Sequence, residues 1–297
     1  MKTPDTCLVC NENRMKPVPF GYAYEERWLQ AWECRTCGII FLFPQPTRAE
    51  LARLYSKEYF GNDFRCGHEG GYFDEQTLER LGRDPLLSTI HVFKSAGRFL
   101  EIGCAGGAFL NAVRASGFDV SGVELSADAA AFARERFGLE VFTGDLFDAQ
   151  LPGNSMDVVL MGDVIEHLPA PLDTLKEIHR ILRPGGLLVI LCPSQTNTLF
   201  SRAGFAIYRL FGRRAAVNLP PYHLFEFRPK SMRGMLARSS FTVLRIDAGL
   251  IPPSQIAMRG SFLQNAGKKI FQYPNMLLTS STGRWGDRMN VFASKHE

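Results

Sequence analysis

The chain contains 297 residues, with 34 Lys and Arg, 30 Asp and Glu and a formal net charge of +4. A hydrophobic fraction of 45% and a charged fraction of 22% are typical of a globular protein with one central domain and appendages. The N-terminus lacks the apolar core of a signal peptide, and no stretch approaches the ~18 to 20 apolar residues that span a bilayer, so we expect a cytoplasmic protein.

Four of the seven cysteines form two Cys-x-x-Cys pairs near the N-terminus, Cys7 with Cys10 and Cys34 with Cys37, separated by 23 residues. Two such pairs present four thiolates to one tetrahedral ion, which is the arrangement of a structural zinc ribbon. A disulfide framework does not fit a chain without a secretion signal, and unligated or redox-active cysteines are the alternative. We therefore predict a zinc-ribbon module at residues 1–46, with Zn²⁺ as a structural metal.

The next segment has a helical pattern. Apolar residues recur at helical spacing from residue 47, and again from residue 72 to about 93 after a loop with four glycines. Residues 47–97 are therefore predicted to form a helical segment between the zinc ribbon and the central domain.

Residues 98–128 carry the strongest functional pattern. A short apolar run ends at Gly103, and apolar residues then recur at helical spacing, so the segment is predicted to be a strand, a glycine turn and a helix. Glycines such as Gly103 and Gly107 let the backbone approach a ligand closely. The second strand ends at Glu124, 21 residues beyond Gly103, where a carboxylate can accept two hydrogen bonds from a ribose diol. The order predicts a nucleotide-type cofactor, and an ordinary α/β turn without a ligand is the alternative.

Strand and helix patterns alternate through the central part of the chain, which predicts an α/β fold. Short connections between them imply a parallel sheet with helices on both faces. Ligands then bind at the carboxyl ends of the strands, where Gly103, Glu124, Asp145 and Asp163 fall. The predicted strands lie near 98–102, 119–123, 140–143, 157–162 and 187–192, the predicted helices near 107–116, 126–137 and 170–182, and two last strands at 241–248 and 288–294.

Phe-Leu-Glu-Ile-Gly-Cys-Ala-Gly-Gly-Ala-Phe-Leu, residues 99–110, resembles the first motif of class I S-adenosylmethionine (SAM)-dependent methyltransferases. The resemblance assigns Glu101 to the methionine end of SAM and Glu124, followed by Leu125, to the ribose. It also assigns to the turn beneath the cofactor Gly103, Cys104, Ala105 and Gly107. Ala105 departs from the pattern, because the family usually has glycine there, and a methyl group fits this position if its φ is negative.

Three further motifs follow in the family's order. Residues 143–146 resemble the third motif, in which an acid, here Asp145 followed by Leu146, faces the adenine amino group. Residues 156–168 resemble the fourth, which includes Asp163, and 180–190 resemble the helix, turn and strand after it. Four ordered motifs leave little room for a dehydrogenase.

The resemblance also implies a domain organisation. It implies a Rossmann-like sheet in a methyltransferase domain at residues 98–297, with 241–248 and 288–294 as an antiparallel pair at one edge. Helices before the first motif, in 47–97, would cover the cofactor cleft. An insertion at about 194–228 would define the acceptor, and the stretch 249–286, which is rich in Gly, Pro and Ser, would form an ordered insertion or a partner surface.

The N-terminal pattern has a resemblance of its own. Cys-x-x-Cys-Gly followed by an apolar strand and Pro-x-Pro resembles a subset of bacterial class I methyltransferases that carry an N-terminal zinc-binding region. These enzymes act in sugar and surface-polysaccharide pathways. The resemblance implies polysaccharide biosynthesis as the context and a sugar as the acceptor of O- or C-methylation.

Positive charge is concentrated after the predicted fifth strand. Residues 195–245 contain nine Arg and Lys against Glu226 as the sole acid, which would attract an anionic acceptor such as a sugar phosphate, whereas a solvated basic face is the alternative.

His167 and His223 are the candidate general bases, with packing roles as the alternative. An amphipathic helix from about 199 to 211 would either pack as a lid or make a peripheral membrane contact.

Other functions remain open from sequence. Glu166-His167 resembles a position in quinone-biosynthesis O-methyltransferases, where a Glu and a His can help to hold a divalent cation. An rRNA or tRNA methyltransferase with zinc-finger recognition is a second alternative, but the basic residues lie mainly outside the zinc module and the overall charge is mild. A non-catalytic SAM-binding scaffold is disfavoured by the intact acidic positions. The acceptor atom and the oligomeric state are not predicted.

Overall fold

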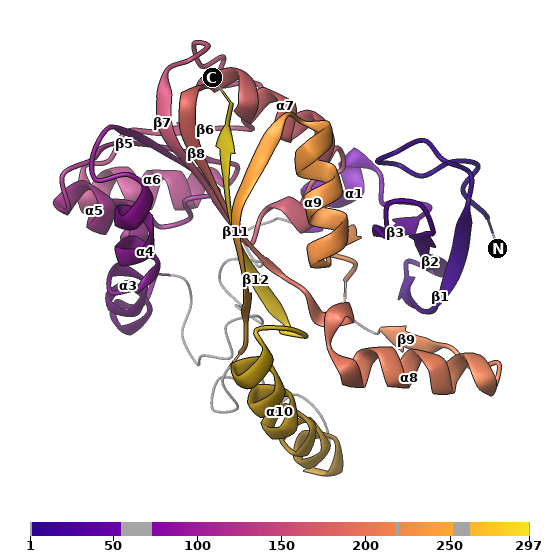
Figure 1. Cartoon of the computed structure of the whole chain (residues 1–297). Helices are drawn as coiled ribbons and strands as arrows, with labels where there is room; N and C mark the ends of the chain where they lie inside the picture. The colour runs from indigo at the N-terminus through magenta and orange to yellow at the C-terminus, as the bar shows by residue number, and fades with distance from the viewer. Residues whose placement is uncertain (1, 55–72, 218–219, 252–261, 297) are drawn as a thin grey trace.

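The computed structural model of the chain describes residues 2–54, 73–217, 220–251 and 262–296. Two sheets lie side by side, a seven-stranded central sheet and a five-stranded N-terminal sheet (Figure 1). Parts of the predicted helical cover, 55–72, and of the second predicted insertion, 252–261, lie outside the described residues.

The central sheet has the order β11-β12-β8-β7-β4-β5-β6. Five strands are parallel, and β12 is antiparallel to both β8 and β11, as predicted for the last two strands. Chain order reverses between β4 and β7, so the carboxyl ends of these two strands form a topological switch point, where open α/β sheets bind their ligands. The strands are β4 (Arg98–Ile102), β5 (Asp119–Glu124), β6 (Val141–Thr143), β7 (Met156–Gly162), β8 (Leu182–Pro193), β11 (Phe241–Gly249) and β12 (Arg288–Lys295).

Helices cover both faces of this sheet because its strands are apolar on both sides. Consecutive strand residues point to opposite faces, so Phe99 packs in one buried cluster with Leu110 and Ile90, whereas Leu100 packs in another with Ile178 and Met235. Figure 1 shows α3 to α6 on one side and α7 with α9 on the other. These helices are α3 (Glu75–Gly82), α4 (Leu86–Phe93), α5 (Ala108–Ala115), α6 (Ala127–Phe137), α7 (Pro171–Ile181) and α9 (Pro229–Arg238).

Two predicted segments differ from the structure. The helical stretch predicted from 72 to 93 is two helices, α3 and α4, because Pro85 stands at the break and Asp74 caps α3 by accepting from the Thr77 N–H. The segment 249–286, described from its Gly, Pro and Ser content without a helix, contains α10 (Phe262–Thr282), which continues through Pro274. A short helix, α1 (Arg48–Leu54), follows the N-terminal sheet.

The N-terminal sheet joins segments that are far apart in sequence, in the order β10-β3-β2-β1-β9. Three strands come from the predicted zinc module, β1 (Met15–Tyr24), β2 (Arg27–Cys34) and β3 (Ile40–Phe43), and two from the first predicted insertion, β9 (Ala215–Val217) and β10 (Phe225–Glu226). The segment that leads to β9 contains η2 (Gln195–Asn197) and α8 (Leu199–Leu210). The insertion therefore completes the sheet that the N-terminal segment begins.

The two sheets share one hydrophobic core. Trp32 and Phe41 of the N-terminal sheet belong to the same buried cluster as Met232 of α9 and Leu175 of α7. This contact fixes the N-terminal sheet against the central domain. Among the described residues, no helix is long and apolar enough to cross a membrane.

The turn before α5 gives a stability prediction. Gly107 has φ +77°, and a Cβ there would lie 2.6 Å from Leu139 Cδ1. Gly185 has φ +71°, but a Cβ there would have no neighbouring atom within 4 Å. Left-handed backbone costs an alanine about 1 to 2 kcal/mol at either site, and the clash adds about 1 to 3 kcal/mol at Gly107 alone. We expect Gly107→Ala to lower the free energy of unfolding in urea by about 2 kcal/mol more than Gly185→Ala. Equal losses would contradict this packing.

Candidate active site

The glycine turn after β4 is held by backbone geometry and by one carboxylate. Gly103 has φ +73°, and a Cβ there would lie 2.5 Å from Val164 Cγ2. Ala105 has φ +45°, so the negative φ that would suit its methyl group is not adopted. The Ala105 N–H donates to Glu124 Oε2 at 2.9 Å. This hydrogen bond stabilises a left-handed conformation that costs an alanine about 1 to 2 kcal/mol. The same φ explains why glycine is usual at this position.

Two carboxyl groups are buried beside this turn, at the ends of β4 and β5. Burial and the nearby Glu124 charge raise the pKa of Glu101 to about 8, and its Oε2 has no hydrogen-bond partner among the described residues. Burial also raises the pKa of Glu124, although the N–H groups of Ser126 and Ala105 donate to its two oxygens. Each carboxylate oxygen has a second lone pair, so Glu124 can still accept ribose hydroxyls. An amino group of a bound ligand could donate a hydrogen bond to Glu101 Oε2.

The other predicted cofactor residues lie at the same edge of the sheet. Cys104 and Leu146 are buried, while Leu125 is exposed after Glu124. Asp145 accepts from the backbone N–H groups of Phe147 and Asp148. The structure thus brings these residues together at the carboxyl edge of the sheet.

Asp163, at the end of β7, has a partner that the sequence did not reveal. Both of its carboxylate oxygens accept from Arg288 Nη2, at 2.5 and 2.7 Å. Arg288 is the first residue of β12 and lies opposite Pro193 of β8. The ion pair therefore links the end of β7 to the start of β12. No local pattern links residues so far apart in the chain.

The structure brings the two candidate bases together. His167 ends η1 (Ile165–His167), and its ring centroid lies 5.0 Å from that of His223, which precedes β10. His167 Nδ1 lies 2.8 Å from the Tyr222 carbonyl oxygen. A carbonyl oxygen only accepts, so Nδ1 carries the proton and the neutral ring has its lone pair on Nε2. That atom is suited to accept a proton.

Buried carboxyl groups surround the two rings. Glu166 Oε1 lies 3.6 Å from His167 Nε2, and Glu226 Oε1 lies 3.6 Å from His223 Nδ1, both longer than a hydrogen bond. Burial and the Asp163 charge raise the pKa of Glu166 to about 8. One ligand atom each from Glu166, His167 and His223 lies within 4.8 Å of the others. The cluster therefore places two carboxyl groups beside the two imidazole rings.

A basic cleft of about 610 Å³ lies between the N-terminal sheet and the C-terminal part of the chain. Its one acid among the described lining residues, Glu33, pairs with Lys16 and Arg228, each at 3.1 Å. The sequence predicted a basic region at 195–245, but the N-terminal cations and Arg284 were missed because only the fold brings them near. The cationic lining residues are Lys16, Arg35, Arg202, Arg228, Lys230, Arg233 and Arg284.

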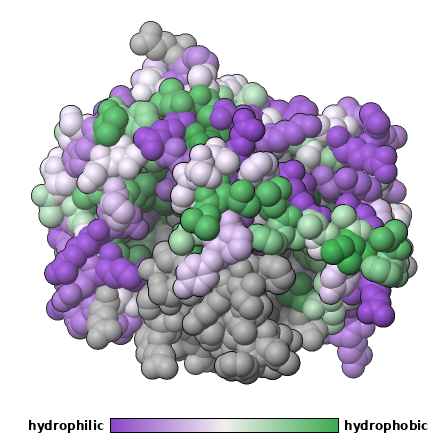
Figure 2. Space-filling model, turned by 60° about the horizontal axis from the view of Figure 1, so that its bottom comes forward, coloured by the Kyte–Doolittle hydropathy of each residue, from purple (hydrophilic) through white to green (hydrophobic). Residues whose placement is uncertain are grey.

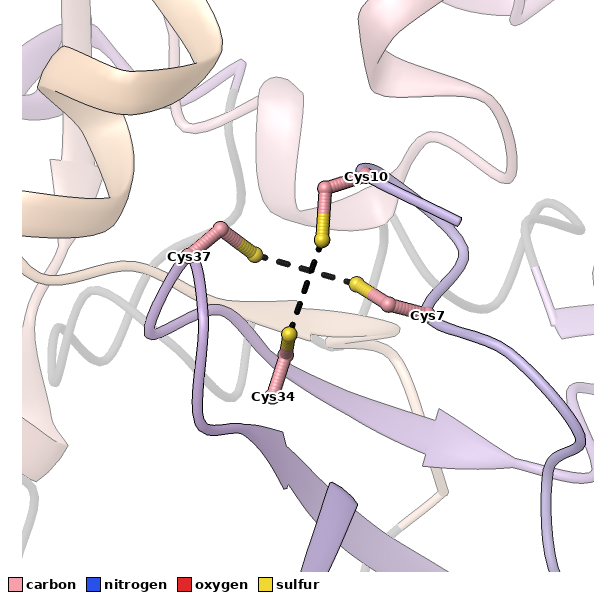
Figure 3. Close-up of side chains that lie close together, drawn as sticks. All are labelled: Cys7, Cys10, Cys34 and Cys37. Atoms are coloured by element: carbon pink, nitrogen blue, oxygen red, sulfur yellow. Dashed lines mark hydrogen bonds between the residues drawn. The ribbon is translucent and has the colours of Figure 1, made fainter. Parts of the chain in front are cut away.

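The four paired cysteines converge on one point (Figure 3). Sγ atoms of Cys7 and Cys37 lie 3.7 Å apart, and those of Cys10 and Cys34 lie 3.6 Å apart. Zn–S bonds of about 2.3 Å in a tetrahedron require sulfur separations of about 3.8 Å, so the four sulfurs fit a zinc ion. A hydrogen bond from the Cys37 thiol lowers the pKa of Cys7 to about 5, and the same bond raises the pKa of Cys37, so the two sulfurs share one proton.

Comparison with known proteins identifies the catalytic domain. The family described as "Methyltransferase domain" matches residues 100–190. A demethylmenaquinone methyltransferase of Staphylococcus epidermidis is 25% identical over 211 residues, 64% of this chain and 85% of that protein. A Mycobacterium tuberculosis protein named "Probable S-adenosylmethionine-dependent methyltransferase" is 32% identical over 164 residues, 55% of this chain and 51% of that one.

A solved structure supports the fold. A SAM-dependent methyltransferase from Archaeoglobus fulgidus matches with a TM-score of 0.52 and 22% identity, over 73% of this chain and 94% of that one. With the sheet order, the glycine turn and the two buried acids, these matches define a class I methyltransferase fold. The protein is a SAM-dependent methyltransferase.

The buried Glu101 carboxyl predicts a pH effect on the cofactor-free protein. Its pKa of about 8, against 4.5 when unfolded, contributes stability that is full below pH 4.5 and is lost as pH rises through 8. Glu101→Gln should remove this loss, so that the variant is more stable than the wild type by about 1 kcal/mol or more at pH 8 in thermal melts. The same variant should bind SAM at least about tenfold more weakly in calorimetry.

Asp119→Asn serves as the control, because Asp119 is exposed at the start of β5, away from the cofactor end of the sheet. It should change neither the pH dependence of stability nor the affinity for SAM. A Glu101→Gln variant that keeps the wild-type pH slope and SAM affinity would remove Glu101 from the cofactor site.

Proposed function

We propose that this methyltransferase acts on a small anionic acceptor, a phosphate-bearing sugar of a glycan pathway, by O- or C-methylation. The basic cleft carries the proposal, because seven cationic side chains line it against one acid that is already paired. Cations in a partly enclosed cleft bind phosphate through charge-assisted hydrogen bonds.

Connectivity supports a common site for the cleft and the histidines. Arg228 lines the cleft two residues after Glu226, which faces His223. The Arg228 guanidinium also donates to the carbonyl of Thr196, just beyond β8. A phosphate held by the cleft would therefore leave the attached sugar within reach of the carboxyl ends of β7 and β8.

The chemistry needs little beyond alignment. The sulfonium of SAM is already an activated leaving group, so the protein must orient the acceptor atom and exclude water. A base is needed if that atom is a hydroxyl oxygen or an acidic carbon. His167 or His223 would take the proton, and the Glu226 carboxyl group beside His223 would stabilise an imidazolium there.

The relatives' acceptors do not carry over directly. The Staphylococcus relative is named for demethylmenaquinone, an uncharged quinone, whereas the cations of this cleft favour an anion. The acceptor of this chain is therefore proposed from its own cleft.

A structural zinc ion on Cys7, Cys10, Cys34 and Cys37 is the second part of the proposal. The close sulfur atoms support it. Cys34 and Gly38 line the basic cleft, so the ion would stiffen one wall of the acceptor site without reaching the methyl group.

The acceptor proposal predicts separable kinetic effects. With a panel of nucleotide sugars, His167→Ala or His223→Ala should lower kcat by about 10²-fold to 10⁴-fold if that ring is the base, with SAM affinity nearly unchanged. Arg233→Gln should raise the KM for the acceptor by about tenfold, because it loses a charged contact to phosphate. Arg238→Gln, on the same helix but outside the cleft, is the matched control.

Full turnover in both histidine variants would exclude a histidine base, and the rate enhancement would then come from alignment of the acceptor with SAM. Equal effects of Arg233→Gln and Arg238→Gln on the KM would exclude the cleft as the phosphate site.

The zinc proposal predicts one ion per chain in protein made with sufficient zinc. Cys34→Ser should lose that ion and lower the free energy of unfolding by about 3 kcal/mol or more, because zinc binding contributes directly to folding. Cys192→Ser, at a buried cysteine outside the cluster, should retain the ion in elemental analysis. A wild-type protein without zinc, or a Cys34→Ser variant that keeps it, would contradict the site.

A further inference from the structure

Helix α8 and the residue after it expose large apolar side chains. Exposed fractions are 55% for Ile207, 39% for Tyr208, 80% for Leu210 and 69% for Phe211. Apolar side chains exposed singly are common on protein surfaces, but four within five consecutive residues form a patch. α8 contains no fully buried residue.

The patch faces away from the protein body. Phe205 stacks on Phe20 of β1 with ring centroids 5.5 Å apart, and this contact holds the inner side of α8. Ile207 and Leu210 are three residues apart and so lie on one face, on the side of the helix opposite Phe205. Figure 1 shows α8 at the lower right of the molecule, and Figure 2, with the underside turned forward, shows hydrophobic side chains on the right-hand side.

Positive charge accompanies this patch. Arg209 and Arg213 are exposed beside it, and no Asp or Glu occurs from residue 195 to 225. α10 contacts α8 and exposes Tyr273 and Leu277 as well. An apolar helix face flanked by arginines and free of acids suits an anionic lipid surface, where apolar side chains enter the headgroup boundary and arginines meet phosphates.

We propose that the outer face of α8 docks this enzyme on the surface of an anionic membrane. The interaction is peripheral and involves Ile207, Leu210 and Phe211 together with the flanking arginines. It does not depend on the identity of the acceptor. Arg202 lies about 12 Å along the same helix from Leu210 and lines the basic cleft, so docking brings the cleft close to the bilayer.

Sedimentation with vesicles tests this surface. The full-length protein should bind vesicles of phosphatidylcholine with phosphatidylglycerol, and bind pure phosphatidylcholine much less. Leu210→Glu combined with Phe211→Glu should lower the bound fraction about tenfold, since each change removes apolar insertion and adds repulsion. Arg209→Gln combined with Arg213→Gln should also weaken binding and reduce its salt dependence.

Val92→Glu, at an exposed apolar residue of α4, is the matched control and should bind vesicles as the wild type does. Failure of the wild type to bind anionic vesicles would overturn the proposal, as would equal losses in the control and the double variant. A concentration-dependent dimer that the Leu210→Glu and Phe211→Glu changes abolish would assign the face to self-association instead. Methylation of a soluble acceptor should be unchanged in the double variant, which separates this test from that of the acceptor.

Discussion

The pairing of β4 with β7 is the constraint on which the rest of the site depends. Phe99 and Leu100 pair with Val158 and Val159 at the centre of the sheet, yet the chain leaves these two strands in opposite directions. In open α/β sheets, ligands bind at the carboxyl ends of strands where the chain order reverses in this way. The buried acids lie on the β4 and β5 side and the histidines on the β7 side, so one strand pairing separates the residues predicted for the cofactor from the two candidate bases.

Desolvated carboxyl groups occur on both sides of the pairing between β4 and β7. Glu101 and Glu166 each have a pKa near 8 because burial penalises their charged forms. Such groups cost stability unless a cation or a donor joins them. These carboxyl groups therefore lower the stability of the fold, but their ionisation responds strongly to a positively charged ligand or an imidazolium. A more stable apolar replacement would lose that response.

Local patterns predicted the glycine turn after β4 and the place of Glu124 at the end of β5. The turn at 103–107, the acid at Glu124 and the cysteine spacing are set by residues close in sequence, so their geometry follows from backbone and ligand chemistry. The basic cleft could be predicted only in part, because Lys16 and Arg284 come from opposite ends of the chain and meet through tertiary packing. The φ of Ala105 was also not predictable, since a hydrogen bond to Glu124 stabilises a conformation that alanine disfavours.

The composition of the N-terminal sheet has a consequence for biosynthesis. β1 to β3 emerge first, but the strands that cover the two edges of their sheet, β9 and β10, begin only at residues 215 and 225. At translation rates of about 5 to 20 residues per second, both edges stay open for on the order of ten seconds or more. Open edges are templates for pairing with other nascent chains. All four clustered cysteines precede residue 38, so they can come together before either edge strand has been made.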